Sequence, residues 1–352
     1  MPVPTFTDIP PFPEDLKTAP LVTISLSRLL ANDPAEAAAL FQAGKNLGFF
    51  YLSLLGCPEG EELYEDAQAL LQLEKDFFSL PDSEKAIADR DNIPESDGFY
   101  GYKRMGTLVM DKLGTRDRHE AYNLKKDDIV GNCTPLPAPQ LIKDHLPLFS
   151  SFARNAHSLI NMMLTHYTTS LGLPPGTLVD LHRLTQRSGD HVRFIRSPPG
   201  PGQSGAPHTD FGSLTILFNW LGGLQVQLPG EREWVYVRPV PGFAIVNLGD
   251  AMVKFTAGLL RSNIHRVVNP PGAQGESVRY SLVYFSRPED EVKMGRLTGG
   301  LVDQQPATDE GEPLNSRQWI LKRGLANRAT PDWTPEKWAA SRGTEGDRID
   351  VV

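Results

Sequence analysis

Short apolar runs separated by turn residues dominate the second half of the chain. After position 185 these runs recur at a spacing of roughly 10 residues, and each has the alternation or β-branched content of a strand. Turns rich in glycine and proline, at 199–202 and 270–272 among others, separate them. The strands are expected at 191–197, 213–218, 224–228, 233–238, 244–248, 264–268 and 279–285. So many short strands in succession indicate a sandwich, a barrel or a jelly roll.

The first half of the chain has helical periodicity instead. Apolar residues of segment 61–79 recur at helical spacing, and Pro81 ends the segment. The longer amphipathic segment 148–171 ends at Gly172, and Asp33 can cap an alanine-rich helix. Helices are expected at 34–45, 61–79, 148–171 and 315–325, and strands at 21–26, 48–52 and near 120–124. Residues 1–20 are expected to form an extended arm because their prolines exclude regular structure.

Composition favours one globular domain that is mainly β with helices. The 352 residues include 31 glycines and 30 prolines, which suit many turns, and 40% hydrophobic residues, which suffice for a core. Neither an internal repeat nor a clean linker is visible. We therefore expect a single domain over 1–352, with a helical and strand layer over about 1–184, a β core over about 185–290, and a C-terminal helix and tail over about 291–352.

Charge and cysteine content exclude several classes of function. The net charge of −8 argues against a nucleic-acid partner, which usually requires a basic face. The two cysteines, Cys57 and Cys133, cannot build a disulfide scaffold and fit a reducing compartment. The start of the chain lacks the features of a signal peptide, and the sequence has no run of 18 apolar residues. A cytoplasmic location without membrane contact is expected, while the oligomeric state is left open.

One pair of residues carries the candidate chemistry. Among 8 histidines, only His208 has a carboxylate two positions later, at Asp210. On a strand these two side chains would share a face, and the strand 264–268 could bring His265 alongside them. Two imidazoles and one carboxylate form the facial triad of non-haem Fe(II) sites, which leaves coordination positions open. The alternative is a surface turn that merely contains a histidine.

Motifs around this pair resemble those of a known family. They read PHTDFGSLTILF at 207–218, GLQV at 223–226, VNLGD at 246–250, SNIHRVV at 262–268 and RYS at 279–281, with LGFFYL at 47–52, FFSLP at 77–81 and GFYGY at 98–102. In this order and spacing, the chain resembles the 2-oxoglutarate/Fe(II)-dependent dioxygenase superfamily, in its isopenicillin N synthase-like branch. The resemblance covers about residues 20–325.

The resemblance implies a fold and a set of ligands. The fold is a double-stranded β-helix, or jelly roll, with an N-terminal helical layer and a C-terminal helix. The iron ligands fall on His208, Asp210 and His265, and the R-x-S motif falls on Arg279 and Ser281, which would hold the distal carboxylate of 2-oxoglutarate. A guanidinium grips a carboxylate through two charge-assisted hydrogen bonds, and a hydroxyl two residues along the strand adds a donor. No catalytic residue beyond the metal centre is required.

The implied activity is oxidation of a small organic molecule in specialised metabolism. Fe(II), 2-oxoglutarate and O2 would generate an Fe(IV)-oxo species that hydroxylates, desaturates or rearranges the substrate. Two alternatives stay open. One is an iron oxidase like isopenicillin N synthase, which uses no 2-oxoglutarate. The other is a non-catalytic ligand-binding protein on the same scaffold, which the full ligand set disfavours.

One strand departs from the family pattern. Where the family usually reads LRxNYYP, this chain reads VRFIRSP at 192–198, so that Ser197 replaces a tyrosine and Ile195 an asparagine. Alternation puts Arg193 on the same face as these two residues, which by resemblance lines the active site. A cation there needs a partner, either an acidic group of the substrate or a protein carboxylate in a structural salt bridge.

Other residues near the site have two interpretations each. Tyr100 and Tyr102 fall where the family's N-terminal segment often reaches the substrate, and Phe285 follows Ser281 at even spacing, but a packing role would also suit the tyrosines. Asn247 and Asp250 are expected to shape a turn rather than to contact substrate.

Overall fold

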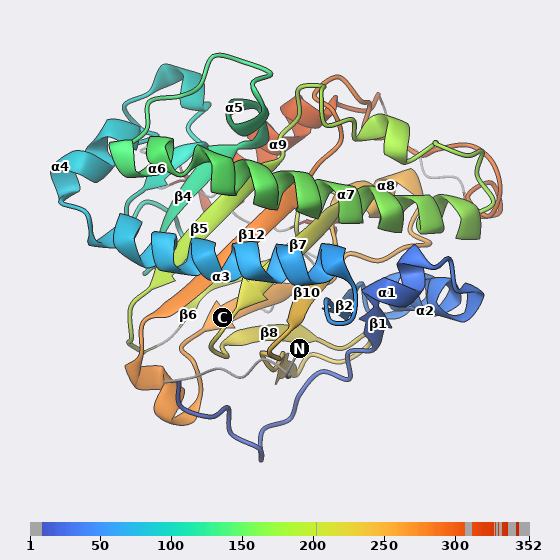
Figure 1. The fold of residues 1–352 in the computed structure, drawn as a ribbon, viewed down its shortest axis with the longest axis horizontal. Coiled ribbons are helices and arrows are strands. Elements are labelled where there is room, and N and C mark those ends of the chain that lie inside the picture. The colour runs from blue at the N-terminus through green and yellow to red at the C-terminus, as the bar shows by residue number, and fades with distance from the viewer. Residues whose placement is uncertain are drawn as a thin grey trace.

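Two β-sheets form the centre of the molecule, seen in the computed structural model (Figure 1). The structure describes residues 9–201, 203–306, 312–326, 328, 330, 333–336 and 343–344. One sheet has eight strands in the order β1-β2-β10-β7-β12-β5-β4-β3, and the other has four in the order β6-β11-β8-β9. The strands within this part of the chain are β1 (Thr23–Ser25), β2 (Phe49–Ser53), β3 (Gly101–Lys103), β4 (Glu120–Lys125), β5 (His191–Ser197), β6 (Gln203–His208), β7 (Leu214–Asn219), β8 (Leu224–Gln227), β9 (Trp234–Tyr236), β10 (Phe243–Leu248), β11 (His265–Val268) and β12 (Arg279–Ser286).

The strands from β5 onward wind as a double-stranded β-helix. Strands β5, β7, β10 and β12 belong to the large sheet, whereas β6, β8, β9 and β11 form the small one. The chain therefore crosses between the sheets at each step except the β8–β9 hairpin, and neighbouring strands within these two groups pair antiparallel. The predicted jelly roll is confirmed.

Helices cover the outer face of the large sheet. In Figure 1, α3 and α7 run side by side across β5, β12 and β7. The α-helices in the described residues are α1 (Leu26–Leu30), α2 (Pro34–Asn46), α3 (Pro58–Ser79), α4 (Asp82–Lys85), α5 (Lys126–Val130), α6 (Gln140–Asp144), α7 (Leu146–Ser170), α8 (Asp250–Phe255) and α9 (Ser316–Leu325). Short 3-10 turns lie at 86–88, 94–96, 179–181 and 272–276. The predicted N-terminal helical layer and C-terminal helix are both present.

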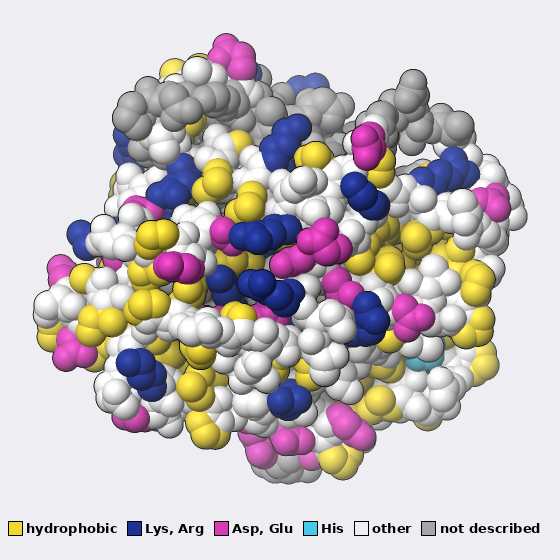
Figure 2. All heavy atoms as spheres, turned by 90° about the horizontal axis from the view of Figure 1, so that it is seen from above, with side chains coloured by type: hydrophobic (Ala, Val, Ile, Leu, Met, Phe, Trp, Pro, Cys, Tyr) yellow, Lys and Arg dark blue, Asp and Glu magenta, His cyan; other side chains and the backbone are white. Residues whose placement is uncertain are grey.

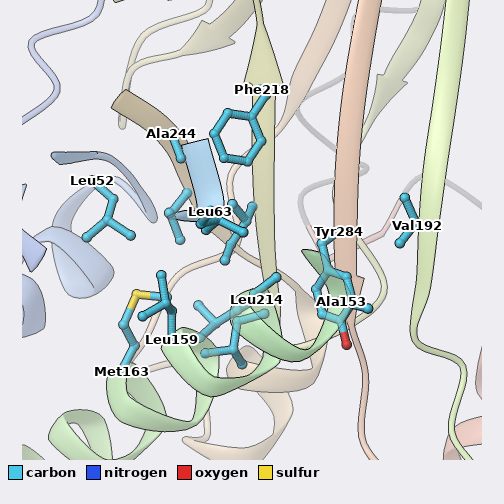
Figure 3. Packing of buried hydrophobic residues seen from close by; sticks show 14 of the residues in the cluster. Leu52, Leu63, Ala153, Leu159, Met163, Val192, Leu214, Phe218, Ala244 and Tyr284 are labelled. Carbon is cyan, nitrogen blue, oxygen red and sulfur yellow. The ribbon is translucent and has the colours of Figure 1, made fainter. Parts of the chain in front are cut away.

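The largest apolar cluster lies between these helices and the sheet (Figure 3). Helical spacing turns one apolar stripe of α3 and one of α7 toward the strands, where the side chains are almost completely buried. Each fully buried leucine or phenylalanine contributes roughly 1.5–3 kcal/mol. Members shown in Figure 3 include Leu63 of α3, Ala153, Leu159 and Met163 of α7, Leu214 and Phe218 of β7, and Tyr284 of β12.

The sequence pattern failed at strand β6, which runs from Gln203 to His208. This segment contains Gly205 and Pro207 and no β-branched residue, so local propensity gave no strand signal. Pairing with β11 nevertheless holds it in the small sheet. As a consequence, Asp210 lies two residues beyond the strand and not within it, contrary to the expected shared strand face. The first residues of the expected arm, 1–8, lie outside the described part of the chain.

Acidic and basic side chains lie intermingled on the face of the molecule seen in Figure 2. Within the described residues, no helix combines the length and the apolar content needed to cross a bilayer.

Candidate active site

Strand pairing brings the three predicted metal ligands together. His208 ends β6 and lies directly opposite His265, which begins β11, and their ring centroids are 4.3 Å apart. Oδ1 of Asp210 lies 3.8 Å from Nε2 of His208 and 3.8 Å from Nε2 of His265. One ligand atom from each residue thus falls within 4.8 Å of the others.

Backbone carbonyls fix the orientation of both imidazoles. Nδ1 of His208 lies 2.7 Å from the carbonyl oxygen of Ala206, and Nδ1 of His265 lies 3.2 Å from that of Asn263. A carbonyl oxygen can only accept, so each Nδ1 carries the proton and each Nε2 presents its lone pair. This is the arrangement in which metal-binding histidines are usually held.

The carboxylate of Asp210 is oriented in the same way. Its Oδ2 accepts hydrogen bonds from Oγ1 of Thr215 at 2.6 Å and from Nδ2 of Asn247 at 2.7 Å. Burial disfavours the charged form, but His265, His208 and these two donors outweigh it and lower the pKa of Asp210. Asn247 and Thr215 face each other across β10 and β7. Asn247 therefore holds the carboxylate in place, a role that the sequence analysis missed.

These residues suit Fe(II) by their chemistry. Two imidazole nitrogens and one carboxylate oxygen converge, and each ligand side chain is fixed through its other polar atom. Two histidines and one carboxylate are the donor set of non-haem Fe(II) oxygenases.

A cavity of about 130 Å³ extends from the triad between the two sheets. We call it the inner cavity. Arg279 on its wall is only 2% exposed, donates from Nε to the carbonyl of Gly222 at 2.8 Å, and donates from Nη1 to Oγ of Ser281 at 2.5 Å. Arg279 pairs directly with Ser197 across β12 and β5, and Ser197 also lines this cavity.

Arg279 has a neighbouring acid in Glu74 of α3, which is completely buried. Oε1 of Glu74 accepts a hydrogen bond from the Ile195 amide at 2.8 Å. Burial raises the pKa of Glu74 well above its ordinary value, so the neutral acid is favoured. Burial also lowers the pKa of Arg279 to about 10, which still leaves the guanidinium charged at neutral pH. Arg279 therefore keeps a positive charge for a ligand in the inner cavity.

A second cavity of about 140 Å³ adjoins the triad. We call it the outer cavity. It shares His208 and Asp210 with the inner cavity, so the triad stands where the two spaces meet. Arg193 and Phe285 also line both, and the side chain of Arg193 donates from Nε to Oδ1 of Asn123 at 2.7 Å.

Strand alternation places the β5 side chains as the sequence predicts. Arg193, Ile195 and Ser197 line the inner cavity. On the opposite face, Phe194 packs in the core and Arg196 pairs with Glu120 at 2.6 Å. Of the two interpretations of Arg193, the structural salt bridge is not seen, because no carboxylate of the described residues lies within 4.0 Å of it.

The two candidate tyrosines line neither cavity. The hydroxyl of Tyr102 donates to Oε2 of Glu120 at 2.6 Å, and its ring packs in the core. Tyr100 is buried against the ring of Phe99, whose centroid lies 5.1 Å away. Phe99, the residue before Tyr100, lines the outer cavity instead.

Several residues of the outer cavity, among them Arg90, Phe99, Asn123 and Arg287, were not predicted from the sequence. For Arg287, the alternation of side chains along β12 could have predicted its place on the cavity wall. Positions 279, 281, 283 and 285 alternate along β12 and all line the inner cavity, and one further step of two residues reaches Arg287. Arg90 and Phe99 lie in irregular segments, where no periodicity predicts the direction of a side chain.

Comparison with known proteins agrees with this geometry. Residues 189–288 match the 2OG-Fe(II) oxygenase superfamily, and residues 20–141 match the family described as non-haem dioxygenase in morphine synthesis N-terminal. A 2-oxoglutarate-dependent dioxygenase of Aspergillus fumigatus is 33% identical over 337 residues, which cover 88% of this chain and 86% of the relative. Another from Gibberella zeae is 31% identical, covering 88% of each chain. The chain belongs to the 2-oxoglutarate/Fe(II)-dependent dioxygenase family.

Solved structures show the same fold. A full-length Neurospora crassa protein crystallised in complex with alpha-KG superposes with a TM-score of 0.71 at 23% identity, covering 89% of this chain and 98% of that one. At this identity the likeness establishes the jelly-roll fold and not the substrate.

Proposed function

We propose that His208, Asp210 and His265 hold one Fe(II), and that Arg279 and Ser281 hold the distal carboxylate of 2-oxoglutarate. The convergence of three ligand atoms within 4.8 Å at the junction of two cavities carries this proposal. The whole chain then acts as one oxygenase unit on a small organic molecule. Specialised metabolism is the proposed setting, supported by fungal relatives that are named as 2-oxoglutarate-dependent dioxygenases.

Each cavity has its own task in this proposal. The inner cavity binds the cosubstrate, since Arg279 and Ser281 provide a cation and a hydroxyl beside the triad. The outer cavity binds the substrate, which reaches the same triad past His208 and Asp210. When bound, Fe(II) supplies the oxidising chemistry, in which 2-oxoglutarate and O2 are converted to succinate and CO2 as the substrate is oxidised.

The residues of this chain contribute position and protection. Ala206 and Asn263 fix the imidazoles, and Thr215 and Asn247 fix the carboxylate, so the ligand geometry exists before any ligand binds. Apolar side chains of Leu217, Val267 and Val283 line the inner cavity and exclude water. Both features favour oxidation of a bound substrate over wasteful side reactions.

Anaerobic binding of 2-oxoglutarate to Fe(II)-loaded protein tests the proposal without a known substrate. The wild type should bind one Fe(II) and then one 2-oxoglutarate, and in air it should form succinate. His208→Ala should lose both steps. His145→Ala is a matched control, because His145 lines neither cavity. Full iron binding by His208→Ala would refute the ligand assignment, and iron-dependent O2 consumption without 2-oxoglutarate would favour the oxidase alternative.

A further inference from the structure

The outer cavity holds more positive charge than its acidic residues balance. Four basic side chains line it, namely Arg90, Lys103, Arg193 and Arg287, while Asp210 is its one lining carboxylate among the described residues. Lys103 forms an ion pair with the buried Asp117 and is thereby neutralised. The positive charges of Arg90, Arg193 and Arg287 still require a counter-charge.

Two of these arginines have no ion-pair partner. Within the described part of the chain, no carboxylate lies within 4.0 Å of Arg193 or Arg287, although Arg287 is only 3% exposed. Nε and Nη1 of Arg287 are buried without a hydrogen-bond partner among those residues. Buried guanidinium nitrogens are costly to leave unpaired, so their presence on a cavity wall requires a reason.

Arg90 extends the same pattern. It is 6% exposed, and its Nε and Nη2 also lack hydrogen-bond partners within the described residues. The nearest carboxylate oxygen, Oδ1 of Asp91, lies 3.9 Å from Nε, beyond hydrogen-bond distance, and is itself bound by Arg328. Arg90 therefore has at most a long ion pair with Asp91 and adds hydrogen-bond donors to the cavity.

Two phenylalanine rings hold the guanidinium groups in place. The guanidinium of Arg193 lies 4.7 Å from the ring centroid of Phe285 and 5.5 Å from that of Phe99. That of Arg287 lies 4.9 Å from Phe99 and 5.9 Å from Phe285. Aromatic rings support the flat faces of a guanidinium and leave its edges free to donate. The rings fix two like charges close together but supply no counter-ion.

The charge of Asp210 is not available to these arginines in the loaded enzyme. Asp210 and a doubly negative 2-oxoglutarate together carry three negative charges, which Fe(II) and Arg279 balance. Burial first, and then repulsion by Arg287, lowers the pKa of Arg193 to about 9, and burial also lowers the pKa of Arg287. Guanidinium groups stay protonated in proteins at neutral pH, so both charges persist. With the cosubstrate in place, no carboxylate among the described residues balances these two arginines.

We propose that the substrate is a small organic acid whose carboxylate binds between Arg193 and Arg287. The inference rests on the proposed function, because it takes the inner cavity as the place of 2-oxoglutarate. The acid group anchors one end of the molecule at the two guanidinium edges, and the rest of the molecule extends along the outer cavity to the triad. Arg90 is placed to bind a second acidic or polar group.

Matched acids and amides test this proposal without turnover. The protein is loaded with Mn(II) and saturating 2-oxoglutarate, and binding of benzoate, phenylacetate, cinnamate and adipate is compared with that of their neutral amides by calorimetry. At least one acid should bind roughly 10-fold or more tightly than its amide, as expected for a desolvated charge pair. Arg193→Gln and Arg287→Gln should each abolish this preference. Arg196→Gln, on the opposite face of β5, should retain it.

Three outcomes would overturn the proposal. The first is equal or weaker binding of every acid compared with its amide in the wild type. The second is an undiminished preference in both arginine variants. The third is a preference that disappears in Arg279→Gln alone, which would place the acid in the inner cavity. Failure of the proposed function would appear separately, as absence of Mn(II) and 2-oxoglutarate binding before any acid is added.

Discussion

The inner and outer cavities both contain buried arginines, but they hold them differently. In the inner cavity, Nε of Arg279 donates a hydrogen bond to the carbonyl of Gly222 and Nη1 donates one to Ser281. These two hydrogen bonds fix the position of Arg279 within the protein. Arg287 in the outer cavity rests against phenylalanine rings, and two of its nitrogens have no partner within the described residues. One site is completed by hydrogen bonds within the protein, and the other is left to be completed by a ligand.

This difference follows from what each cavity must recognise. A cosubstrate shared by a whole family has one shape, so a cation held in one orientation serves every member. A substrate differs from member to member, and part of the outer cavity lies on irregular segments such as those that carry Arg90 and Phe99. The inner cavity is therefore built mostly from paired strands, whereas strands and irregular segments both contribute to the outer cavity.

Loss of a triad ligand should have the largest effect, because it removes the point where the two cavities meet. His265→Ala should weaken Fe(II) binding by at least 100-fold, since the second imidazole nitrogen is lost. Equilibrium dialysis against Fe(II) or Mn(II) measures this. His145→Ala should match the wild type, and near-normal metal affinity in His265→Ala would show that the triad is not the metal site.

Loss of a residue that orients a ligand should have a smaller effect. Asn247→Ala removes one of two donors to Oδ2 of Asp210, and residues in such positions typically contribute roughly 10- to 100-fold in metal affinity. Asn219→Ala is a matched control, because Nδ2 of Asn219 bonds instead to the Leu221 carbonyl. The same dialysis checks both variants. An affinity unchanged by Asn247→Ala would mean that Thr215 alone fixes the carboxylate.

Glu74, the acidic neighbour of Arg279, should make the stability of the folded protein depend on pH. Because the pKa of Glu74 is raised on folding, the folded protein holds this proton more tightly than the unfolded chain does. The associated stability is therefore present at low pH and is lost as the pH rises through the raised pKa. Glu74→Gln stays neutral and keeps an acceptor for Ile195.

The Glu74→Gln variant should therefore melt at a higher temperature than the wild type at about pH 9, by roughly 1–1.5 °C for each kcal/mol of stability regained. At about pH 5 the two proteins should melt at similar temperatures. Thermal melts across this pH range check the prediction, with Glu62→Gln on the exposed side of α3 as a control for the change of residue type. A difference that is independent of pH would mean that Glu74 is not held neutral.

The smallest effect is expected at the residue that departs from the family pattern. Ser197 lies opposite Arg279, but its hydroxyl makes no hydrogen bond to the described residues. A single neutral hydrogen bond to a ligand contributes about 0.5–1.5 kcal/mol, so Ser197→Ala should weaken 2-oxoglutarate binding by only about 2- to 10-fold. Calorimetry on Mn(II)-loaded protein measures it. A loss as large as that of an arginine variant would make Ser197 a principal anchor.

Most site residues that the sequence predicted correctly lie on paired strands, where side chains alternate between the two faces. His265, Arg279 and Ser281 lie on strands whose alternation was visible, and one further step of two residues past Phe285 reaches Arg287, just beyond β12. Strand β6 was missed because its glycine and proline carry no local signal, and only pairing with β11 defines it. The position of Asp210 beyond that strand was missed for the same reason.

The outer cavity was predicted less well for a different physical reason. The sequence left Tyr100 and Tyr102 with two interpretations, contact with substrate or a packing role, and burial of their rings against Phe99 and Phe77 determines their direction. Irregular segments take their side-chain directions from tertiary packing, which no periodicity records. The sequence alone could not show that the arginines of this cavity lack partners, because that depends on which residues line the cavity. The acidic character inferred for the substrate therefore required the structure.

A titration of 2-oxoglutarate into Mn(II)-loaded protein under anaerobic conditions tests the central distinction most directly. Losing the partner of a desolvated carboxylate costs about 2–5 kcal/mol, so Arg279→Gln should raise the Kd on the order of 100-fold. Arg287→Gln, which alters the outer cavity, should change this Kd by less than about threefold. Arg196→Gln, which is outside both cavities, should match the wild type. An unchanged Kd in Arg279→Gln, or an equal loss in Arg287→Gln, would contradict the assignment of the inner cavity to the cosubstrate.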